Sequence, residues 1–353
     1  MNISFVSILP NTDFIWALFY EQDVIPTFFP TTIQEFLKKH DSDQIREMFS
    51  EKNQFILVPL NENSKKRREE VGANFFKKIS MQNESTLLLD CREFGESGLD
   101  FLVGFLLFSW SFDKYKTNEK NLNKNSIKEI IVLCNEPEKM KTHFSLINPA
   151  IQGVFLARSL TSEPPNVFFP EAYANHLKSL EDDGIQVEII NEVELKKIGM
   201  SALLAAGQGS IHSSAVAILT WNGLNDSNEK PIVIIGKGVC FDSGGLCLKS
   251  TLHQKDMKWD KAGGGVVAGF LKAIALAKMP CHVIGIIGLV ENMPDGGAAK
   301  PGDVIKTMSG KTIEIVDTDA EGRLVLADCL WYAQKRFHPK LMIDLGTLTI
   351  ETF

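Results

Sequence analysis

Residues 231–249 read PIVIIGKGVCFDSGGLCLK, an apolar run of strand length that passes into a loop rich in glycine and charge. So apolar a run favours a strand buried on both faces of a parallel sheet. In sheets of this kind, functional groups gather in the loops that follow the carboxyl ends of the strands. Lys237, Asp242 and Lys249 stand in such a loop and are candidates for chemistry, although a turn with surface charges explains the loop more simply when it is read alone.

The chain on either side of this strand alternates between strand-like and helix-like stretches. Strands are expected at 54–60, 86–90, 128–134, 186–191, 214–221, 282–290 and 341–345, and helices at 63–79, 97–112, 193–206, 264–278 and 324–337. The alternation predicts an α/β fold with two domains, each a mostly parallel sheet flanked by helices, joined by a linker helix. Because a helix at 147–162 ends before a double proline, we expect an N-terminal domain over 1–146, a linker helix and Pro-Pro turn over 147–165, and a second domain over 166–353.

Length, charge and cysteine spacing exclude several classes of protein. At about 150 residues per domain, 353 residues make two domains. The net charge of −7 gives no general attraction to nucleic acid or anionic lipid, and the most apolar run, 101–112, is too short to cross a bilayer. The six cysteines form no Cys-x-x-Cys pair and are expected to be buried thiols in a reducing compartment. Because the amino terminus lacks the apolar core of a signal peptide, we expect a cytoplasmic protein with no membrane or nucleic-acid partner.

A second loop of interest, residues 256–265, reads DMKWDKAGGG. Asp260 precedes three glycines that open a helix. A carboxylate at a helix start is stabilised by the helix dipole, so a structural cap explains Asp260. A metal ligand explains it equally well, and the sequence leaves the two interpretations open.

A third loop, DTDAEGR, begins at Asp317 and carries three acids at one helix start. Thr318 and Glu321 fit the capping box T-x-x-E, which needs only one acid. Asp319 adds a further carboxylate, and such clusters repel unless cations neutralise them. Arg323 alone cannot balance three charges, whereas a divalent metal ion would, and carboxylate ligands suit Mg²⁺, Mn²⁺ or a hydrolytic Zn²⁺.

The motifs of other hydrolases are missing from the sequence. The chain contains neither the H-E-x-x-H of one-zinc peptidases nor the G-x-S-x-G of serine hydrolases. Carboxylates with a lysine suit a two-metal hydrolase, in which paired ions hold the attacking water and the departing group. Carboxylate clusters alone would also permit a two-metal phosphoesterase.

The run DTDAEGRLVL at 317–326 closely resembles NTDAEGRL, the signature of the leucine aminopeptidases, or cytosol aminopeptidase family. GKGVCFDSGGLCLK resembles the first metal loop of that family, and 256–260 with the following glycines resembles its second. Residues 291–304 and 347–349 also match, in the same order. The resemblance is dense over 231–349, weaker over 160–230 and faint over 1–150, so we expect 166–353 to be the catalytic domain.

The resemblance implies two divalent metal ions, Mn²⁺ or Zn²⁺, with Mg²⁺ as a further candidate. Asp242 and Glu321 would bind both ions. Lys237, as a neutral amine, and Asp260 would complete the readily exchanged site. Asp319, with a backbone carbonyl, would complete the tighter one.

The resemblance also implies the catalytic and substrate-binding residues of a metal-dependent aminopeptidase acting on peptides with a free amino terminus. Lys249 would polarise the scissile carbonyl, and Arg323 would hold a bicarbonate that acts as general base. The implied substrate-binding residues are Met257, Asp260, Thr347, Leu348 and Ile350.

Several residues depart from the pattern of the family. Asp317 replaces the usual asparagine, and Lys261 stands where methionine is common. Ile350 replaces a glycine that lines the pocket for the first side chain, so we expect a preference for small first residues.

The last residue, Phe353, stands where the family continues, so a C-terminally shortened member is expected, with a catalytic domain incomplete at that end. A complete chain would form a homo-oligomer, a hexamer by the resemblance. The alternative function is that of a catalytically impaired member that acts as a binding or assembly protein.

Overall fold

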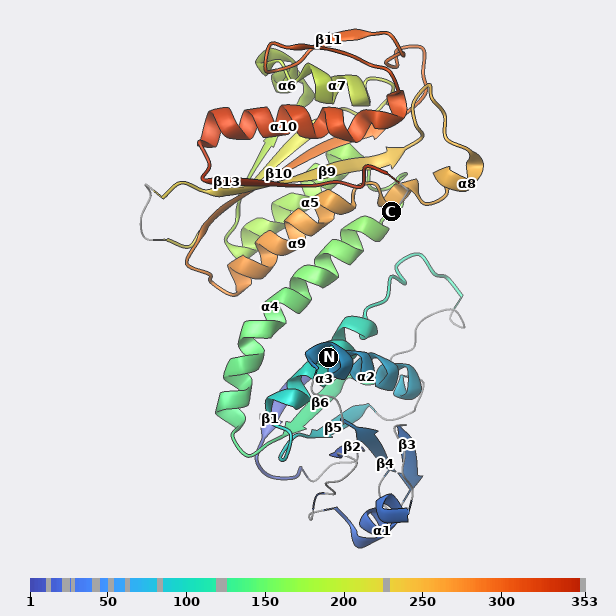
Figure 1. Ribbon diagram of the computed structural model, residues 1–353, viewed down its shortest axis with the longest axis vertical. Helices are drawn as coiled ribbons and strands as arrows, with labels where there is room; N and C mark the ends of the chain where they lie inside the picture. The colour runs from blue at the N-terminus through green and yellow to red at the C-terminus, as the bar shows by residue number, and fades with distance from the viewer. Residues whose placement is uncertain are drawn as a thin grey trace. The chain divides into compact units, whose positions relative to one another are not determined.

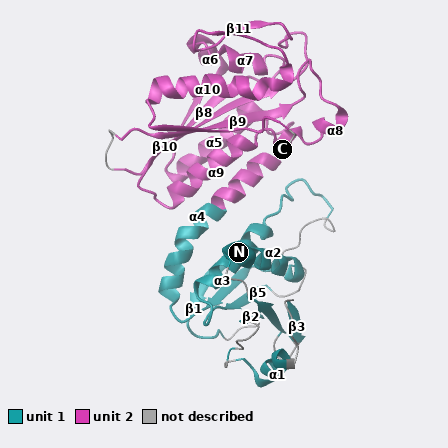
Figure 2. Ribbon diagram, viewed as in Figure 1, with its two compact units in different colours: residues 1–151 teal, residues 152–353 magenta. Residues whose placement is uncertain are grey.

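The computed structural model describes residues 1–10, 14–20, 26, 29–39, 45–49, 54–60, 64–80, 85–118, 126–224 and 229–349. The chain divides into two compact units, residues 1–151 and 152–353 (Figure 2). Helix α4, Pro137–Ser162, crosses the division and begins earlier than the helix expected at 147–162. In the described part, no helix combines the length and apolarity needed to cross a membrane.

The first unit contains a six-stranded sheet of order β1-β6-β5-β2-β4-β3, in which only the edge strand β3 is antiparallel (Figure 1). Its strands are β1 (Asn2–Val6), β2 (Ile15–Tyr20), β3 (Arg46–Phe49), β4 (Gln54–Pro59), β5 (Thr86–Asp90) and β6 (Glu129–Leu133). Its helices are α1 (Thr31–Lys39), α2 (Lys65–Ile79), α3 (Glu96–Ser109) and the first half of α4. The apolar run at 101–112 lies mostly in α3, where Phe101 and Phe105 are fully buried and pack edge-on against Phe75 and Phe76 of α2. The mostly parallel sheet expected for this part is confirmed.

The second unit contains a five-stranded sheet of order β13-β9-β10-β8-β7 and a separate hairpin of β11 and β12. Its strands are β7 (Gln186–Ile190), β8 (Ala215–Asn222), β9 (Ile232–Asp242), β10 (His282–Asn292), β11 (Val304–Lys306), β12 (Thr312–Glu314) and β13 (Leu341–Leu345). Its helices are the end of α4, α5 (Pro170–Leu177), η2 (Lys178–Asp183), α6 (Glu192–Ile198), α7 (Ser201–Gly207), α8 (Thr251–Gln254), η3 (Met257–Trp259), α9 (Ala262–Leu276), η4 (Thr318–Ala320) and α10 (Glu321–Phe337).

The α/β class is confirmed, but the second sheet is mixed rather than mostly parallel. β13, β9 and β10 run parallel, whereas β8 and β7 join them by antiparallel pairing. Helices cover both faces of this sheet, so parallel and antiparallel strands show the same continuous apolar pattern. The sequence pattern therefore could not separate the two kinds of strand.

Each face of the second sheet packs against its own set of helices, and Figure 1 shows α10 on one side and α5 and α9 on the other. Val233, Ile235 and Val239 of β9 pack with α6, α7 and α10. Ile234 and Cys240 of β9 pack with α4, α5 and α9 on the opposite face. β9 therefore contributes to both cores, as its continuous apolar run predicts.

A β-bulge interrupts the pairing of β9 with β10. Val239 pairs with Val290, but Asp242 pairs with Asn292, so β9 carries one extra residue over this interval. A bulge shifts the alternation of side chains by one position. Lys237 and Asp242 are an odd number of residues apart, yet the shift lets both face the side of the sheet that α10 covers.

Glycine at the start of α9 allows that helix to lie close to the sheet. A Cβ at Gly263 would lie 2.3 Å from the carbonyl oxygen of Leu345 on β13 and 3.0 Å from the amide nitrogen of Lys237 on β9. Any side chain would push the helix away from both strands. The close approach brings Asp260, just before α9, next to Lys237.

A buried carboxylate on α10 fixes two neighbouring segments. Asp328, 1% exposed, accepts hydrogen bonds from the backbone nitrogens of Ala202 and Leu203 at the start of α7, at 2.8 and 3.2 Å, and of Met308 beside the hairpin, at 3.0 Å. Burial raises the pKa of Asp328, and the three backbone donors partly oppose that rise. The side chain thus supplies acceptors that a short helix cannot supply itself.

Replacement of Asp328 by alanine is expected to lower the free energy of unfolding by about 3 kcal/mol, because buried backbone N–H groups lose their acceptor. Asp328→Asn, which keeps one carbonyl oxygen, should lose less. Urea denaturation of the two variants and the parent chain measures the difference. Equal stability of the alanine variant and the parent would show that these hydrogen bonds contribute little.

Candidate active site

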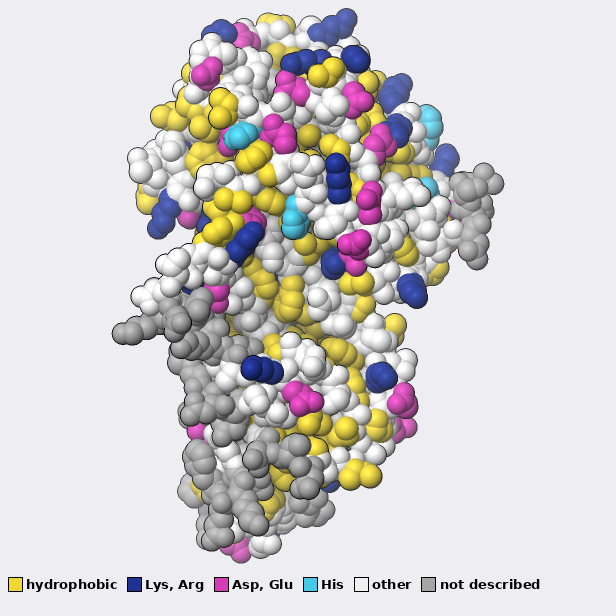
Figure 3. Space-filling view, turned by 180° about the vertical axis from the view of Figure 1, so that it is seen from behind, with side chains coloured by type: hydrophobic (Ala, Val, Ile, Leu, Met, Phe, Trp, Pro, Cys, Tyr) yellow, Lys and Arg dark blue, Asp and Glu magenta, His cyan; other side chains and the backbone are white. Residues whose placement is uncertain are grey.

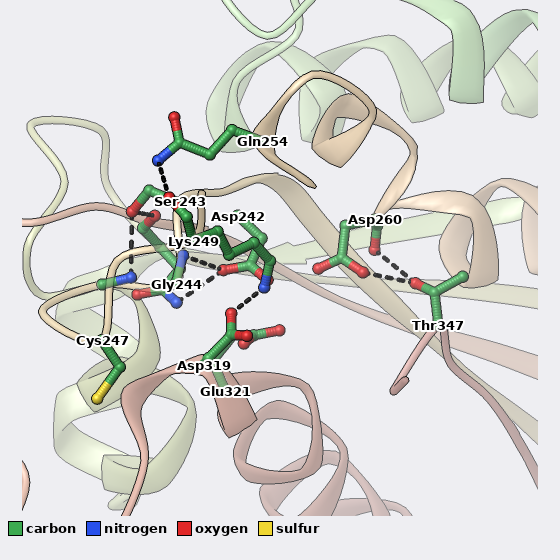
Figure 4. Close-up of polar contacts among 12 residues, drawn as sticks. Asp242, Ser243, Gly244, Cys247, Lys249, Gln254, Asp260, Asp319, Glu321 and Thr347 are labelled. Carbon is green, nitrogen blue, oxygen red and sulfur yellow. Dashed lines mark hydrogen bonds and ion pairs between the residues drawn. The ribbon is translucent and has the colours of Figure 1, made fainter. Parts of the chain in front are cut away.

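Three segments of the second unit meet at the carboxyl ends of β9 and β13 (Figure 4). β9 provides Lys237 and Asp242, the turn after η3 provides Asp260, and η4 with the start of α10 provides Asp319 and Glu321. Asp242, Asp319 and Glu321 each offer a carboxylate oxygen, and the three atoms lie within 4.8 Å of one another.

Lys237 joins Asp260 to this cluster. Its Nζ lies 2.8 Å from Asp260 Oδ1 and 2.8 Å from Glu321 Oε1, and it donates a hydrogen bond of 2.7 Å to the carbonyl oxygen of Thr347. The structure thus brings together all five residues that the sequence proposes as metal ligands.

Four of these five side chains are deeply buried, Asp319 is about one third exposed, and some of the carboxylate oxygens lack a donor. Lys237, Asp242 and Glu321 are at most 3% exposed, and Asp260 is 7% exposed. Asp260 Oδ2 and Glu321 Oε2 have no hydrogen-bond partner among the described residues. Buried carboxylate oxygens without donors are costly unless a cation balances them. Four carboxylates and one amine form a donor set that fits hard or borderline divalent ions such as Mn²⁺ or Zn²⁺.

The pKa values follow from burial and mutual repulsion. Burial raises the pKa of Glu321 to about 7, opposed by Lys237 and assisted by Asp242 and Asp260. Burial raises the pKa of Asp260 in the same way. Burial would lower the pKa of Lys237, but the charges of Asp260 and Glu321 outweigh it and hold that pKa above its ordinary value. The surrounding carboxylates thus favour the ammonium form of Lys237, whereas the resemblance implies a neutral amine once metal is bound.

Lys249 lies among the same carboxylates. Its Nζ is 2.6 Å from Asp242 Oδ2 and also contacts Asp319 Oδ1, and its side chain is only 8% exposed. The amine group therefore reaches the centre of the cluster.

The loop that carries Lys249 is held in place by glycines and by Thr318. Gly244 and Gly245 have φ of 89° and 64°, a conformation that L residues with a side chain rarely adopt. Thr318 Oγ1 donates to the carbonyl oxygen of Gly244 at 2.6 Å and accepts from the amide of Cys247 at 2.8 Å. This hydroxyl thus cross-links the first and third loops of the site.

The capping box that Thr318 and Glu321 fit in sequence does not form, because the Thr318 hydroxyl bonds across to the first loop. Asp317 instead caps η4, accepting from the amide of Asp319 at 2.8 Å, and α10 has no side-chain cap. Asp317 is exposed and is not part of the carboxylate cluster.

The capping interpretation of Asp260 is also wrong. No side chain caps α9, and Asp260 turns instead toward Lys237 and Thr347, whose Oγ1 donates to Asp260 Oδ1 at 2.6 Å. Thr347 therefore contacts a candidate ligand directly, a role that the sequence reasoning did not assign to it.

Of the remaining expected site residues, three lie in segments next to the ligand cluster, and one lies outside the residues that the structure describes. Met257 begins η3 and is half-buried, while Leu348 is 44% exposed and packs near Gly322 at the start of α10. Arg323 is exposed, and its side chain forms no hydrogen bond or ion pair with another described residue. Ile350 lies outside the described residues.

Sequence reasoning missed Asn292, which ends β10 and is buried against Asp242. The available signal was a polar residue that ends a buried apolar strand, at the sheet edge where functional groups gather.

Comparison with protein families matches residues 155–353 to the model described as "Cytosol aminopeptidase family, catalytic domain". Two similar curated proteins are each described as "Probable cytosol aminopeptidase". The one from Caulobacter vibrioides is 43% identical over 281 residues, which cover 80% of this chain and 57% of that protein. The one from Agrobacterium fabrum is 48% identical over 256 residues, which cover 72% of this chain and 51% of that protein. The chain thus spans about half the length of the curated relatives it matches.

Among solved structures, the chain is similar to "Bottromycin maturation enzyme BotP", with a TM-score of 0.79 and 26% sequence identity. The match covers 96% of this chain and 73% of that chain. A second structure of that enzyme, matched equally well, is a complex with Mn. Both units of this chain therefore have a counterpart in one known fold.

Proposed function

Because the chain belongs to the cytosol aminopeptidase family, we propose that it releases the first amino acid from peptides at a two-metal centre held by Lys237, Asp242, Asp260, Asp319 and Glu321. One observation carries the proposal: the five side chains meet in a buried cluster in which Asp260 and Glu321 hold carboxylate oxygens without donors. The manganese complex of the solved relative supports Mn²⁺ as one candidate ion, with Zn²⁺ and Mg²⁺ as the others.

Divalent ions held there would supply an activated water and polarise the scissile carbonyl. Asp242 and Glu321, at the centre of the cluster, would serve both ions, with Lys237 and Asp260 on one side and Asp319 on the other. Asp260 also lies where it can attract the free α-amine of a peptide, since a carboxylate favours a nearby ammonium group.

Lys249 would stabilise the negative charge that develops on the carbonyl oxygen during attack. Its ammonium lies at the cluster, in contact with Asp242 and Asp319, and would turn from these carboxylates toward the substrate once ions are bound there. Arg323, exposed near the start of α10, would hold a bicarbonate ion that accepts the proton of the attacking water.

Further proposals concern parts of the chain around the site. Met257, Thr347 and Leu348 would contact the substrate, and Ile350 would narrow the pocket for its first side chain.

Residues 166–353 would form the catalytic domain, 147–165 the linker and 1–146 the N-terminal domain. We also propose a cytoplasmic location and, for the complete protein, a hexamer. On the face that Figure 3 shows, acidic and basic side chains are interspersed, and the proposal includes no nucleic-acid partner.

The full chain, freed of metal by a chelator, should regain hydrolysis of leucyl and alanyl p-nitroanilides when Mn²⁺ or Zn²⁺ is added. Activity that survives exhaustive chelation would contradict a metal mechanism. Binding of two ions without hydrolysis would favour the alternative of a binding or assembly protein. Hydrolysis of a phosphate ester in place of the anilides would favour a phosphoesterase.

A further inference from the structure

Asn292 lies where the bulge in β9 ends. It is the last residue of β10, it pairs with Asp242 across the sheet, and it is 5% exposed. A buried amide must satisfy its donors and acceptors within the protein, so its orientation is tightly determined by its neighbours. Its neighbours here belong to two of the loops that carry candidate metal ligands.

The side-chain amide of Asn292 donates two hydrogen bonds. Nδ2 lies 2.8 Å from Asp242 Oδ1 and 3.0 Å from the carbonyl oxygen of Thr318. Both partners can only accept, and this settles which end of the amide carries the nitrogen. The amide oxygen faces Gly245, where a Cβ would approach it to 2.8 Å.

These bonds determine which oxygen of Asp242 remains for a cation. Oδ1 of Asp242 accepts from Asn292 and, at 2.9 Å, from the amide of Gly244. Oδ2 lies on the other side, 2.6 Å from Lys249 Nζ. Two neutral donors on one oxygen fix the plane of the carboxylate without neutralising its charge.

The same amide joins the third loop of the site to the first. Thr318, whose carbonyl oxygen accepts the second bond, directly precedes Asp319 in η4. The backbone carbonyl of Asn292 in turn accepts from the amide and the hydroxyl of Ser243, at 3.0 and 2.7 Å. One residue therefore ties the β9 loop, the end of β10 and the η4 segment together.

We propose that Asn292 is a positioning residue of the metal centre, which orients Asp242 and aligns the segment bearing Asp319 and Glu321. This inference rests on the proposed function, because it requires that the carboxylate cluster binds divalent ions. It assigns Asn292 no direct contact with metal or substrate.

The test is titration of the metal-stripped full chain with Mn²⁺ by isothermal calorimetry. Asn292→Ala removes both donated hydrogen bonds and should weaken Mn²⁺ binding about 10- to 100-fold, the range for residues that orient metal ligands. Asn222→Ala is the matched control, since Asn222 also ends a strand and accepts a backbone hydrogen bond, from Leu224, but is exposed. It should leave the affinity unchanged.

A second variant separates orientation from charge. Asn292→Asp keeps the size of the side chain but replaces the donor with an acceptor and adds a negative charge. If charge alone governed the site, Mn²⁺ would bind more tightly; if the donor orients Asp242, binding should weaken despite the added charge. Thermal unfolding of each variant shows whether it is folded. If Asn292→Ala does not fold, the Mn²⁺ affinity of Asn292→Asp tests the inference.

Mn²⁺ binding by the parent chain and by the variants distinguishes a failure of the proposed function from a failure of this inference. A parent chain that binds no Mn²⁺ would overturn the proposed function and this inference with it. A parent chain that binds Mn²⁺ while both folded Asn292 variants bind it equally well or better would overturn the inference alone.

Discussion

Glu321→Gln is expected to reduce both Mn²⁺ affinity and kcat/KM for a leucyl substrate by more than about 100-fold, since even residues that only orient a metal ligand contribute 10- to 100-fold. Glu321 is 1% exposed, lies in the carboxylate cluster and faces Lys237 at 2.8 Å. The amide has nearly the same size but no charge and one oxygen fewer. Calorimetry with Mn²⁺ and steady-state kinetics measure the two effects separately.

The control for this variant is Asp317→Asn, the same chemical change a few residues earlier. Asp317 is exposed and lies outside the cluster, and asparagine also caps a helix well, so metal affinity and activity should stay within about twofold of the parent. If Glu321→Gln behaves like Asp317→Asn, Glu321 does not bind the metal and the proposed centre is wrong.

Lys249→Ala should lower kcat by about 10²- to 10³-fold with little change in KM, the loss seen when one donor to a developing oxyanion is removed. The interaction strengthens in the transition state, so kcat and kcat/KM should fall together. Mn²⁺ affinity should hold or rise, because the variant removes a cation that contacts Asp242 and Asp319.

Lys255→Ala is the matched control for Lys249, because it removes an exposed lysine from the same region of the chain. It should alter neither kcat nor metal binding. If Lys249→Ala abolishes Mn²⁺ binding or leaves kcat unchanged, then Lys249 acts in assembling the centre or not at all, and its assignment to the transition state fails.

The local pattern of the chain predicts most of the second unit. The apolar run that begins at residue 231 becomes strand β9, next to the middle strand of the sheet, and the stretch expected as a helix at 324–337 becomes most of α10. The Ser309-Gly310 dipeptide, which predicts a hairpin turn, lies between β11 and β12, with Gly310 at φ 84°. These features depend on periodicity and turn chemistry, which neighbouring residues largely determine.

Features that depend on contacts between distant parts of the chain cannot be predicted from local sequence patterns. Thr318 could cap its own helix or bond to a distant loop, and only the fold brings the carbonyl of Gly244 within reach of its hydroxyl. Asp260 likewise meets Lys237 only because glycine lets α9 approach the sheet. Strand β2, at the middle of the first sheet, was not anticipated from the pattern of residues 15–20.

The bulge in β9 also bears on how this chain can change over time. A point mutation at position 240 or 241 alters one side chain and leaves the direction of the others as it was. Loss or gain of a single residue between Lys237 and Asp242 would turn one of them to the far face of the sheet, where α5 and α9 pack. The number of residues between Lys237 and Asp242 is therefore constrained as well as their identities, since Val239 and Cys240 are fully buried. A descendant of this chain that lost or gained one residue there would no longer bring Lys237 and Asp242 to the same side of the sheet.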